Sequence, residues 1–457
     1  MRAWIIAAVL AFVPTVFSAA PSVYPTGTTI YRPDRAWNGY TVHPTPDAQG
    51  VVLIDMNGRV VKRWESLVAA SGPYRLLPGG YMMGGDRDRA PHQEAFSLVQ
   101  LDWNGKEVWR FDRTEQLKNA DGTLTWAARL HHDWQREGSP NGYYTPDSSP
   151  LVDRGRTLIL AHKNLTNAAI TDKRLEDDYL LEVAWDGKLL WEWHANEHID
   201  ELGFSAQARE TMKRSVAYNA RRESADWLHM NAAAYVGPNK WFDAGDERFR
   251  PDNVIWSSRE ASIIAIVDRT GKVVWRMGPD YRDSEPLRTL GQIVGQHHPH
   301  IIPKGLPGAG NLLVFDNGGA SGYGAPSPSS PDGTGAFRRD SSRVLEINPV
   351  TFEKVWEYSV AGQERFRFFS HYISSAQRLP NGNTLITEGA DGRFFEVTPD
   401  REIVWEYVNP FFSRQNPIVN NVYRAYRVPY DWVPQLAKPV EQAVVPPPNG
   451  QFRVPPQ

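Results

Sequence analysis

The sequence predicts an all-β fold: a six-bladed β-propeller of four-stranded blades with loop and helical insertions. Two observations predict it. The 457 residues include 17 Trp, 18 Tyr, 18 Phe, 36 Gly and 35 Pro, so residues that pack well in strands are abundant, and so are residues that form turns. A hairpin pattern also recurs six times: an apolar strand, a short turn, and an apolar strand that ends in Trp.

The six hairpins are the strongest structural signal in the chain. In the first three copies the turn contains Asn-Gly or Asp-Gly, which readily adopt the positive φ angles of a tight hairpin turn. Because one hairpin cannot bury its own apolar face, six copies indicate a repeat architecture in which neighbouring units cover each other. The copies span residues 51–64, 98–109, 180–191, 263–275, 344–356 and 394–405.

The spacing between the copies predicts the number of blades. The first two copies are separated by the length of one four-stranded blade, and so are the last two. Each longer interval contains one further pair of candidate strands: 128–134 with 157–161, 227–236 with 253–256, and 300–303 with 311–315. Six blades follow, and seven are the alternative if the N-terminal and C-terminal segments pair. Residues 197–222 are expected to form a helical insertion and residues 321–339 a long loop.

The two ends of the chain differ from the repeats. Residues 1–20 are predicted to be a secretory signal peptide, with Arg2 before an apolar run at 3–17 and small residues at a cleavage site. An uncleaved membrane anchor is the alternative. Residues 21–435 are predicted to form a single propeller domain, and 436–457 a Pro-rich disordered tail. The protein is therefore expected to be exported, to the periplasm or outside the cell.

Composition and motifs exclude some classes of function. The chain has no cysteine, which excludes thiolate catalysis, zinc–thiolate sites and iron–sulfur clusters. A net charge of −3 without a basic block gives no indication of nucleic-acid binding. The sequence contains no phosphate-binding loop, dinucleotide-binding glycine motif, HExxH motif or EF-hand loop. The oligomeric state is not predicted.

The placement of the histidines indicates where chemistry could occur. The first strand of each propeller blade lines the central channel, so side chains on different blades converge there. Histidines lie on or just before the first strands of four predicted blades. They are His131, His132, His229, His297, His298, His300 and His371. The histidines at 43, 92, 194 and 198 lack this placement and are expected at the surface.

Histidine can act as a general acid or base, as a metal ligand, or as a nucleophile that carries a transferred group. Arg259 and Arg343 could bind an oxyanion such as sulfate or could form salt bridges within a blade. Asp133, Asp316 and Asn317 are expected to cap turns or to orient a histidine. These residues alone leave covalent catalysis, acid–base catalysis and metal binding open.

Two pairs of motifs point to a known family. Trp-Leu-His-Met-Asn at 227–231 is followed by Ser-Ser-Arg at 257–259, and Gln-His at 296–297 is followed by Phe-Asp-Asn-Gly at 315–318. Further similar stretches are 252–256, 266–278, 342–343, 355–358 and 422–427. In these motifs the chain resembles the bacterial arylsulfate sulfotransferase family, from about residue 50 to about residue 430.

The resemblance implies a periplasmic six-bladed propeller that moves a sulfuryl group from a phenolic sulfate to another phenol. A channel histidine would carry the group without a cofactor, and His229 and His297 match supporting histidines. The family's carrier histidine lies on the last blade, where the matching stretch 388–393 has none, so His371 is the substitute candidate. His132 and Arg259 complete the predicted catalytic set.

Two other hypotheses remain open. One is a metal-dependent oxidoreductase or lyase, in which three or four histidines would hold copper, iron or another ion. The candidate ligands are His131, His132, His229, His297, His298, His300 and His371. The other is a non-catalytic propeller that binds a sugar or a partner protein. Under both enzymatic hypotheses the expected partner is a small molecule, and under sulfuryl transfer this molecule is aromatic. The only expected membrane contact is an uncleaved signal anchor.

Overall fold

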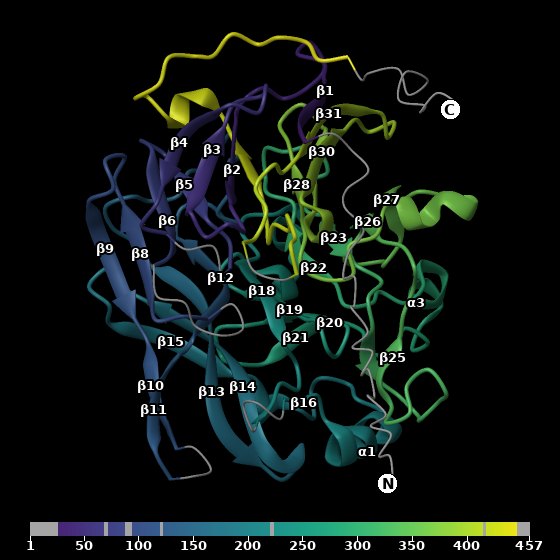
Figure 1. The fold of residues 1–457 in the computed structure, drawn as a ribbon. Coiled ribbons are helices and arrows are strands. Elements are labelled where there is room, and N and C mark those ends of the chain that lie inside the picture. Colours follow the sequence, from purple (N-terminus) through teal and green to yellow (C-terminus); the bar gives the residue numbers. More distant parts are fainter. Residues whose placement is uncertain are drawn as a thin grey trace, which may run out of the picture.

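The computed structural model describes residues 26–67, 72–86, 94–118, 122–219, 224–414 and 417–445. The predicted signal peptide and the end of the predicted tail lie outside these residues. Six antiparallel sheets, called blades A to F, make up the body of the protein (Figure 1). The predicted six-bladed propeller is therefore confirmed. Within the described part of the chain, no helix is both long and apolar enough to cross a bilayer.

Three blades come from the first half of the chain, apart from the C-terminal strand β32. From the innermost strand outward, blade A contains β32 (Tyr426–Val428), β2 (Tyr40–Pro44), β3 (Val51–Ile54) and β4 (Val60–Trp64). Blade B contains β5 (Arg75–Leu77), β6 (Tyr81–Gly85), β8 (Ser97–Leu101) and β9 (Glu107–Asp112). Blade C contains β12 (Leu130–Arg136), β13 (Thr157–Asn167), β14 (Thr171–Val183) and β15 (Leu189–His194).

The second half of the chain continues the same pattern. Blade D contains β18 (Met230–Tyr235), β19 (Val254–Ser258), β20 (Ile263–Val267) and β21 (Val273–Met277). Blade E contains β22 (His297–Ile301), β23 (Leu312–Asp316), β26 (Arg343–Ile347) and β27 (Lys354–Tyr358). Blade F contains β28 (Ser375–Arg378), β29 (Thr384–Glu388), β30 (Arg393–Val397), β31 (Ile403–Val408) and a fifth strand, β1 (Gly27–Tyr31).

The two ends of the chain close the ring on different blades. The C-terminal strand β32 pairs with β2 as the innermost strand of blade A, whereas the N-terminal strand β1 pairs with β31 on the outside of blade F. The two terminal strands therefore join existing blades, and the alternative of a seventh blade is wrong. Beyond β32, Val444 pairs with Tyr31.

A Trp on the outermost Trp-bearing strand links five of the six blades to the next blade. The indole Nε1–H of Trp275 donates to Pro349 O at 2.8 Å, and that of Trp356 donates to Pro399 O at 2.8 Å. Equivalent bonds run from Trp109, Trp193 and Trp405 to the hairpin turn of the following blade. In blade C the donor is Trp193 and not Trp191, which ends the predicted hairpin, and in blade A the buried Nε1–H of Trp64 has no hydrogen-bond partner among the described residues. A Trp at this position fills the space between two sheets and satisfies a turn carbonyl, which explains why the sequence pattern ends in Trp.

Insertions gather at one end of the propeller, shown at the bottom of Figure 1. The long β13–β14 hairpin, the hairpin of β10 (Thr114–Lys118) and β11 (Leu124–Ala128), and α1 (Ala206–Ser215) lie there. The helical insertion predicted at 197–222 is confirmed by α1. The loop predicted at 321–339 instead contains a small hairpin, β24 (Ser321–Tyr323) with β25 (Thr334–Phe337).

The remaining elements are short. The strands are β7 (Glu94–Ala95), β16 (Tyr218–Asn219) and β17 (Ser224–Ala225), all in the sheet of blade C. The helices are α2 (Lys240–Asp243) and α3 (Glu285–Leu290). Short 3₁₀ helices lie at Ala195–His198, Glu247–Phe249, Gly362–Arg367, Gly389–Asp391 and Tyr430–Trp432.

Candidate active site

Irregular backbone marks the end of the channel at which the innermost strands begin, called the channel mouth. The pairing register shifts near the start of β12, β18 and β22. His132, His229 and His298 have φ angles of 53°, 49° and 54°, in the left-handed region that non-glycine residues seldom adopt. In blade F, Ser374 occupies this position with a φ of 91°. Such strain and bulges re-aim side chains and cluster at functional sites.

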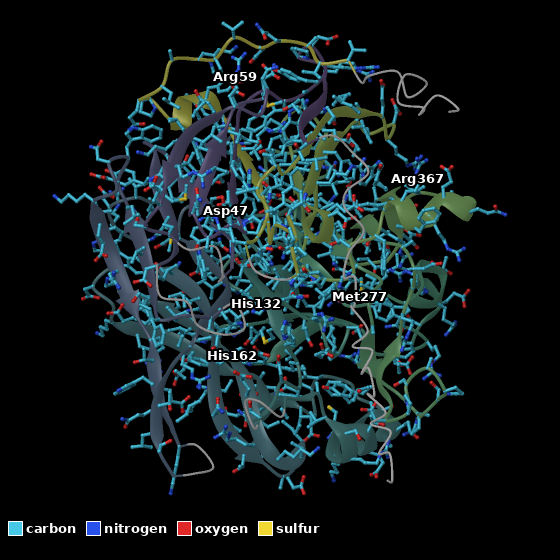
Figure 2. All side chains as sticks on the ribbon, in the orientation of Figure 1. Asp47, Arg59, His132, His162, Met277 and Arg367 are labelled. Carbon is cyan, nitrogen blue, oxygen red and sulfur yellow. The ribbon has the colours of Figure 1, made fainter. Side chains whose placement is uncertain are left out.

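Three histidines from three blades meet at the channel mouth. The rings of His132 and His229 lie 4.7 Å apart between centroids. The ring of Tyr423, which precedes β32, lies 5.8 Å from His132 and 6.5 Å from His297. The structure therefore places His132 against His229 and both His132 and His297 near Tyr423, a residue that the sequence analysis missed. Figure 2 shows the position of His132 in the interior of the molecule.

Each of these histidines has a different partner on its Nδ1 atom. In His229, Nδ1 lies 2.6 Å from Asp226 Oδ2. In His297, it lies 2.8 Å from Asn317 Oδ1. In His132, it lies 2.7 Å from Nδ1 of His131. The partner of a ring nitrogen determines the tautomer and the proton affinity of a histidine, so three similar side chains acquire different properties.

The pKa values of the three histidines shift in different directions. Burial, followed by the charge of Arg424, holds the pKa of His297 well below 6.5, although the hydrogen bond to Asn317 acts in the opposite direction and raises it. Burial and the neighbouring His229 hold the pKa of His132 well below 6.5 as well. Burial alone would lower the pKa of His229, but the Asp226 carboxylate more than offsets burial and raises it. Near neutral pH, His297 is therefore a neutral base and His229 retains a proton more readily.

Deeper in the channel, the polar groups bind one another. Asp133 lies between two cations, at 2.8 Å from Arg75 Nη2 and 2.8 Å from Arg424 Nη1. His300 Nε2 contacts the hydroxyl of Tyr143 at 2.8 Å, and His298 Nδ1 contacts Ala376 O at 3.0 Å. His298 and His300 therefore form part of the packing below the mouth, and the structure does not place them against His229.

Arg259 and His371 lie at the outer part of the mouth. Arg259 is bonded through its backbone N–H to His229 O at 3.1 Å, and its guanidinium pairs with Glu260. Its charge lowers the pKa of His371, second to burial. His371 is an exposed residue three positions before Ser374, so it lies closer to solvent than the other channel histidines.

Comparison with known proteins identifies the family of the chain. A family model described as Arylsulfotransferase (ASST) matches residues 140–410, which is more than half of the chain. The chain belongs to the arylsulfotransferase family. Membership assigns it to sulfuryl transfer in general. His229, Arg259, His297 and His371 lie within the matched span.

Other comparisons add little about this arylsulfotransferase. No curated protein matches the chain. A protein of unknown function from Bacteroides caccae is 10% identical, with 86% of this chain and 100% of that chain covered and a TM-score of 0.42. The Dos1 propeller is 10% identical (83% and 75% covered, TM-score 0.33). Virginiamycin B lyase from Staphylococcus aureus is also 10% identical (84% of each chain, TM-score 0.34). These distant similarities carry no argument about activity.

A second cluster of titratable groups lies in blade C behind the mouth. His162, which the sequence analysis did not select, stacks on His131 with 3.5 Å between ring centroids. Both rings lie beside Asp178, and Glu94 lies beside His162. His162 was missed because the strand predicted at 157–161 continues to Asn167 in the structure. The acidic residues 176–178 before the third hairpin were the available signal.

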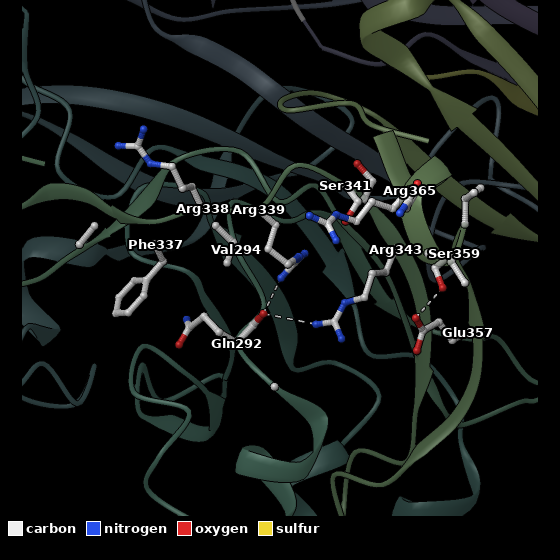
Figure 3. A pocket seen from close by; sticks show the side chains of 17 residues that line it. Gln292, Val294, Phe337, Arg338, Arg339, Ser341, Arg343, Glu357, Ser359 and Arg365 are labelled. Atoms are coloured by element: carbon white, nitrogen blue, oxygen red, sulfur yellow. Dashed lines mark hydrogen bonds between the residues drawn. The ribbon is translucent and has the colours of Figure 1, made fainter. Parts of the chain in front are cut away.

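A pocket of about 710 Å³ lies on the outer side of blade E (Figure 3). Arg339 and Arg343 line it, and both guanidinium groups donate to Gln292 O and pair with Asp316. Arg343, a sequence-based candidate for oxyanion binding, therefore forms a salt bridge in this pocket and does not reach the channel mouth.

Among the histidines expected at the surface, His43 is fully buried against Phe394, because blade F covers β2. His92 lies outside the described residues.

Proposed function

We propose that this arylsulfotransferase moves a sulfuryl group from an aryl sulfate to a phenol, with His297 as the carrier. The observation that supports this choice is the hydrogen bond of 2.8 Å between His297 Nδ1 and Asn317 Oδ1. An amide oxygen accepts only a hydrogen bond, so the proton stays on Nδ1 and the lone pair on Nε2 is available. The low pKa of His297 keeps that lone pair unprotonated at neutral pH.

In the first half-reaction, Nε2 of His297 attacks the sulfur of the donor, and the bond between sulfur and the phenolic oxygen breaks. A sulfuryl group is then bound to His297, and the leaving phenolate needs a proton. His229 is placed to supply it, because its ring contacts His132 at the mouth and Asp226 stabilises its protonated form. The products are sulfohistidine, neutral phenol and neutral His229.

In the second half-reaction, the acceptor phenol gives its proton to His229, and its oxygen attacks the sulfur. The bond between nitrogen and sulfur breaks, which releases the new aryl sulfate and restores His297. Arg259 and an N–H of His132 are proposed to stabilise the charge on the sulfate oxygens. Arg259 is bonded through its backbone to His229, and its charge acts on His371, so we propose that it binds an incoming anion at the mouth.

The proposal is tested with purified protein, 4-nitrophenyl sulfate as the donor and a phenol as the acceptor. We expect acceptor-dependent release of 4-nitrophenol with ping-pong kinetics. When the donor is added without acceptor and the sample is not acidified, mass spectrometry should find one sulfuryl group on the peptide that contains His297. Binding of both phenols without turnover would instead support a non-catalytic propeller.

We expect Asp226→Asn to move the alkaline limb of the pH profile of kcat/KM for the donor to lower pH. The first half-reaction needs protonated His229, so activity falls as pH rises through the pKa of His229. Removing the carboxylate removes the group that raises this pKa. On the alkaline side kcat/KM should fall by about 10²-fold, as for the loss of a general acid. Asp102→Asn, in a hairpin turn, is the control, and an unchanged limb in Asp226→Asn would contradict the role of His229.

We also propose that the protein is exported, on the basis of the signal peptide predicted at residues 1–20. Cell fractionation and N-terminal sequencing of the mature protein test this. Cleavage near residue 20 is the expected result, and an intact N-terminus in the membrane fraction would identify an anchor.

A further inference from the structure

The cluster in blade C contains three buried ligand-type atoms that face one another. His131 Nε2 lies 3.3 Å from Asp178 Oδ1, and His162 Nε2 lies 3.2 Å from the same oxygen. The side chains are 0%, 1% and 0% exposed for His131, His162 and Asp178. None of the three atoms makes a hydrogen bond of acceptable geometry. Buried polar atoms are nearly always bonded, so this group requires an explanation.

The separations suit a metal ion. With bonds of about 2.0–2.1 Å to nitrogen and oxygen, a tetrahedral ion holds its ligand atoms about 3.3–3.4 Å apart. Two imidazoles and one carboxylate form a common three-ligand set for zinc and related ions, with a fourth position for water. The two imidazole rings are stacked 18° from parallel. Because a metal bond lies in the plane of its imidazole, binding one ion would require the two rings to tilt out of this stacked arrangement.

The opposite atom of each ligand is already engaged. His162 Nδ1 lies 3.1 Å from Glu94 Oε1. His131 Nδ1 lies 2.7 Å from His132 Nδ1, and Asp178 Oδ2 accepts the N–H of Met230 at 2.9 Å. Metal-bound histidines usually donate their other N–H to a carboxylate or a similar acceptor, which orients the ring and fixes the tautomer. These contacts leave His131 Nε2, His162 Nε2 and Asp178 Oδ1 as the three ligand atoms that lie close together.

Three adjacent strands hold the three residues. His131 lies on β12, His162 on β13 and Asp178 on β14, and His162 is the direct cross-strand partner of Asp178. Strands hold the backbone of a site more precisely than loops do, so binding would require rotation of side chains and no rearrangement of the sheet. The site differs from the predicted set of seven channel histidines, of which it contains only His131.

We propose that His131, His162 and Asp178 bind one divalent transition-metal ion of the zinc class. The ion would link three strands of blade C. With Nε2 of His131 on the ion, its proton lies on Nδ1 and is donated to His132 Nδ1, so the proton of His132 lies on Nε2. This last consequence rests on the proposed function, since it makes His132 a hydrogen-bond donor to the sulfate oxygens at the channel mouth.

The test is metal binding, with no turnover measurement, so its failure is separate from failure of the proposed function. The full chain is treated with a chelator, Zn²⁺ is added, and unbound ion is removed by gel filtration. Inductively coupled plasma mass spectrometry should find about one ion per chain, and Zn²⁺ should raise Tm. His162→Gln should bind none and show no rise in Tm. His43→Gln, which alters another fully buried histidine, should behave like the wild type.

If the His162→Gln variant does not fold, a second measurement on the wild type tests the proposal. Crystals of the wild type soaked in Zn²⁺ should show an anomalous scattering peak at the zinc edge among His131, His162 and Asp178. A peak only elsewhere would overturn the proposal. So would a wild type that binds none of Zn²⁺, Mn²⁺, Co²⁺ or Cu²⁺, which would make the cluster a set of buried ion pairs around a protonated His162.

Discussion

His297→Gln is expected to lower kcat/KM for 4-nitrophenyl sulfate by at least about 10³-fold, as loss of a nucleophile does in other enzymes. His297 combines a low pKa, a fixed tautomer and a place among His132, His229 and Tyr423. Glutamine keeps a polar side chain of similar length but cannot carry a sulfuryl group. The variant should also show no sulfuryl adduct by mass spectrometry after exposure to the donor.

His371→Gln is the matched variant, because the resemblance to the family places the carrier on the last blade. His371 is exposed, and Ser374 occupies the position in blade F that histidine occupies in blades C, D and E. We expect His371→Gln to keep the adduct on His297 and to change kcat/KM by less than about tenfold, as a change in substrate positioning would. Loss of the adduct in His371→Gln but not in His297→Gln would show that His371 is the carrier.

Asp133→Asn is expected to lower the free energy of unfolding by about 3–5 kcal/mol, the usual effect of removing one partner from a buried ion pair. Asp133 is 2% exposed and contacts both Arg75 and Arg424. Those arginines come from blade B and from the segment before β32, so the carboxylate links three parts of the ring. Without it, two buried guanidinium groups face each other across the channel.

Urea titration and Tm measure this effect. Asp340→Asn removes an exposed partner of Arg365 and should change Tm little, because exposed pairs are weak. The double variant Asp133→Asn with Arg424→Met should recover part of the loss, since it removes one of the unpaired charges. Wild-type stability in Asp133→Asn would contradict the proposed role of Asp133 in ring closure.

Much of the fold follows from local sequence. Alternating apolar residues, turns such as Asn-Gly and a terminal Trp are properties of short segments, so six hairpins and their strand pairs were predictable. The sequence also predicted that histidines on the first strands line the channel, but it did not separate His132, His229 and His297 from the other channel histidines. The number of blades was harder to predict from the sequence, because it depends on where β1 and β32 pair. Both strands lie far in the sequence from the strands with which they pair.

The sequence by itself determined the propeller, the six hairpins and a channel lined by histidines, because strand periodicity and turn chemistry act over a few residues. Only the tertiary structure decided which histidines share a site. His162 joins His131 through the unpredicted extension of β13, and His298 lies below the mouth while His297 lies within it. A bulge moves a side chain to the other face of a strand, and a pKa depends on partners from other blades. Both are set by contacts between distant segments, which no local pattern encodes.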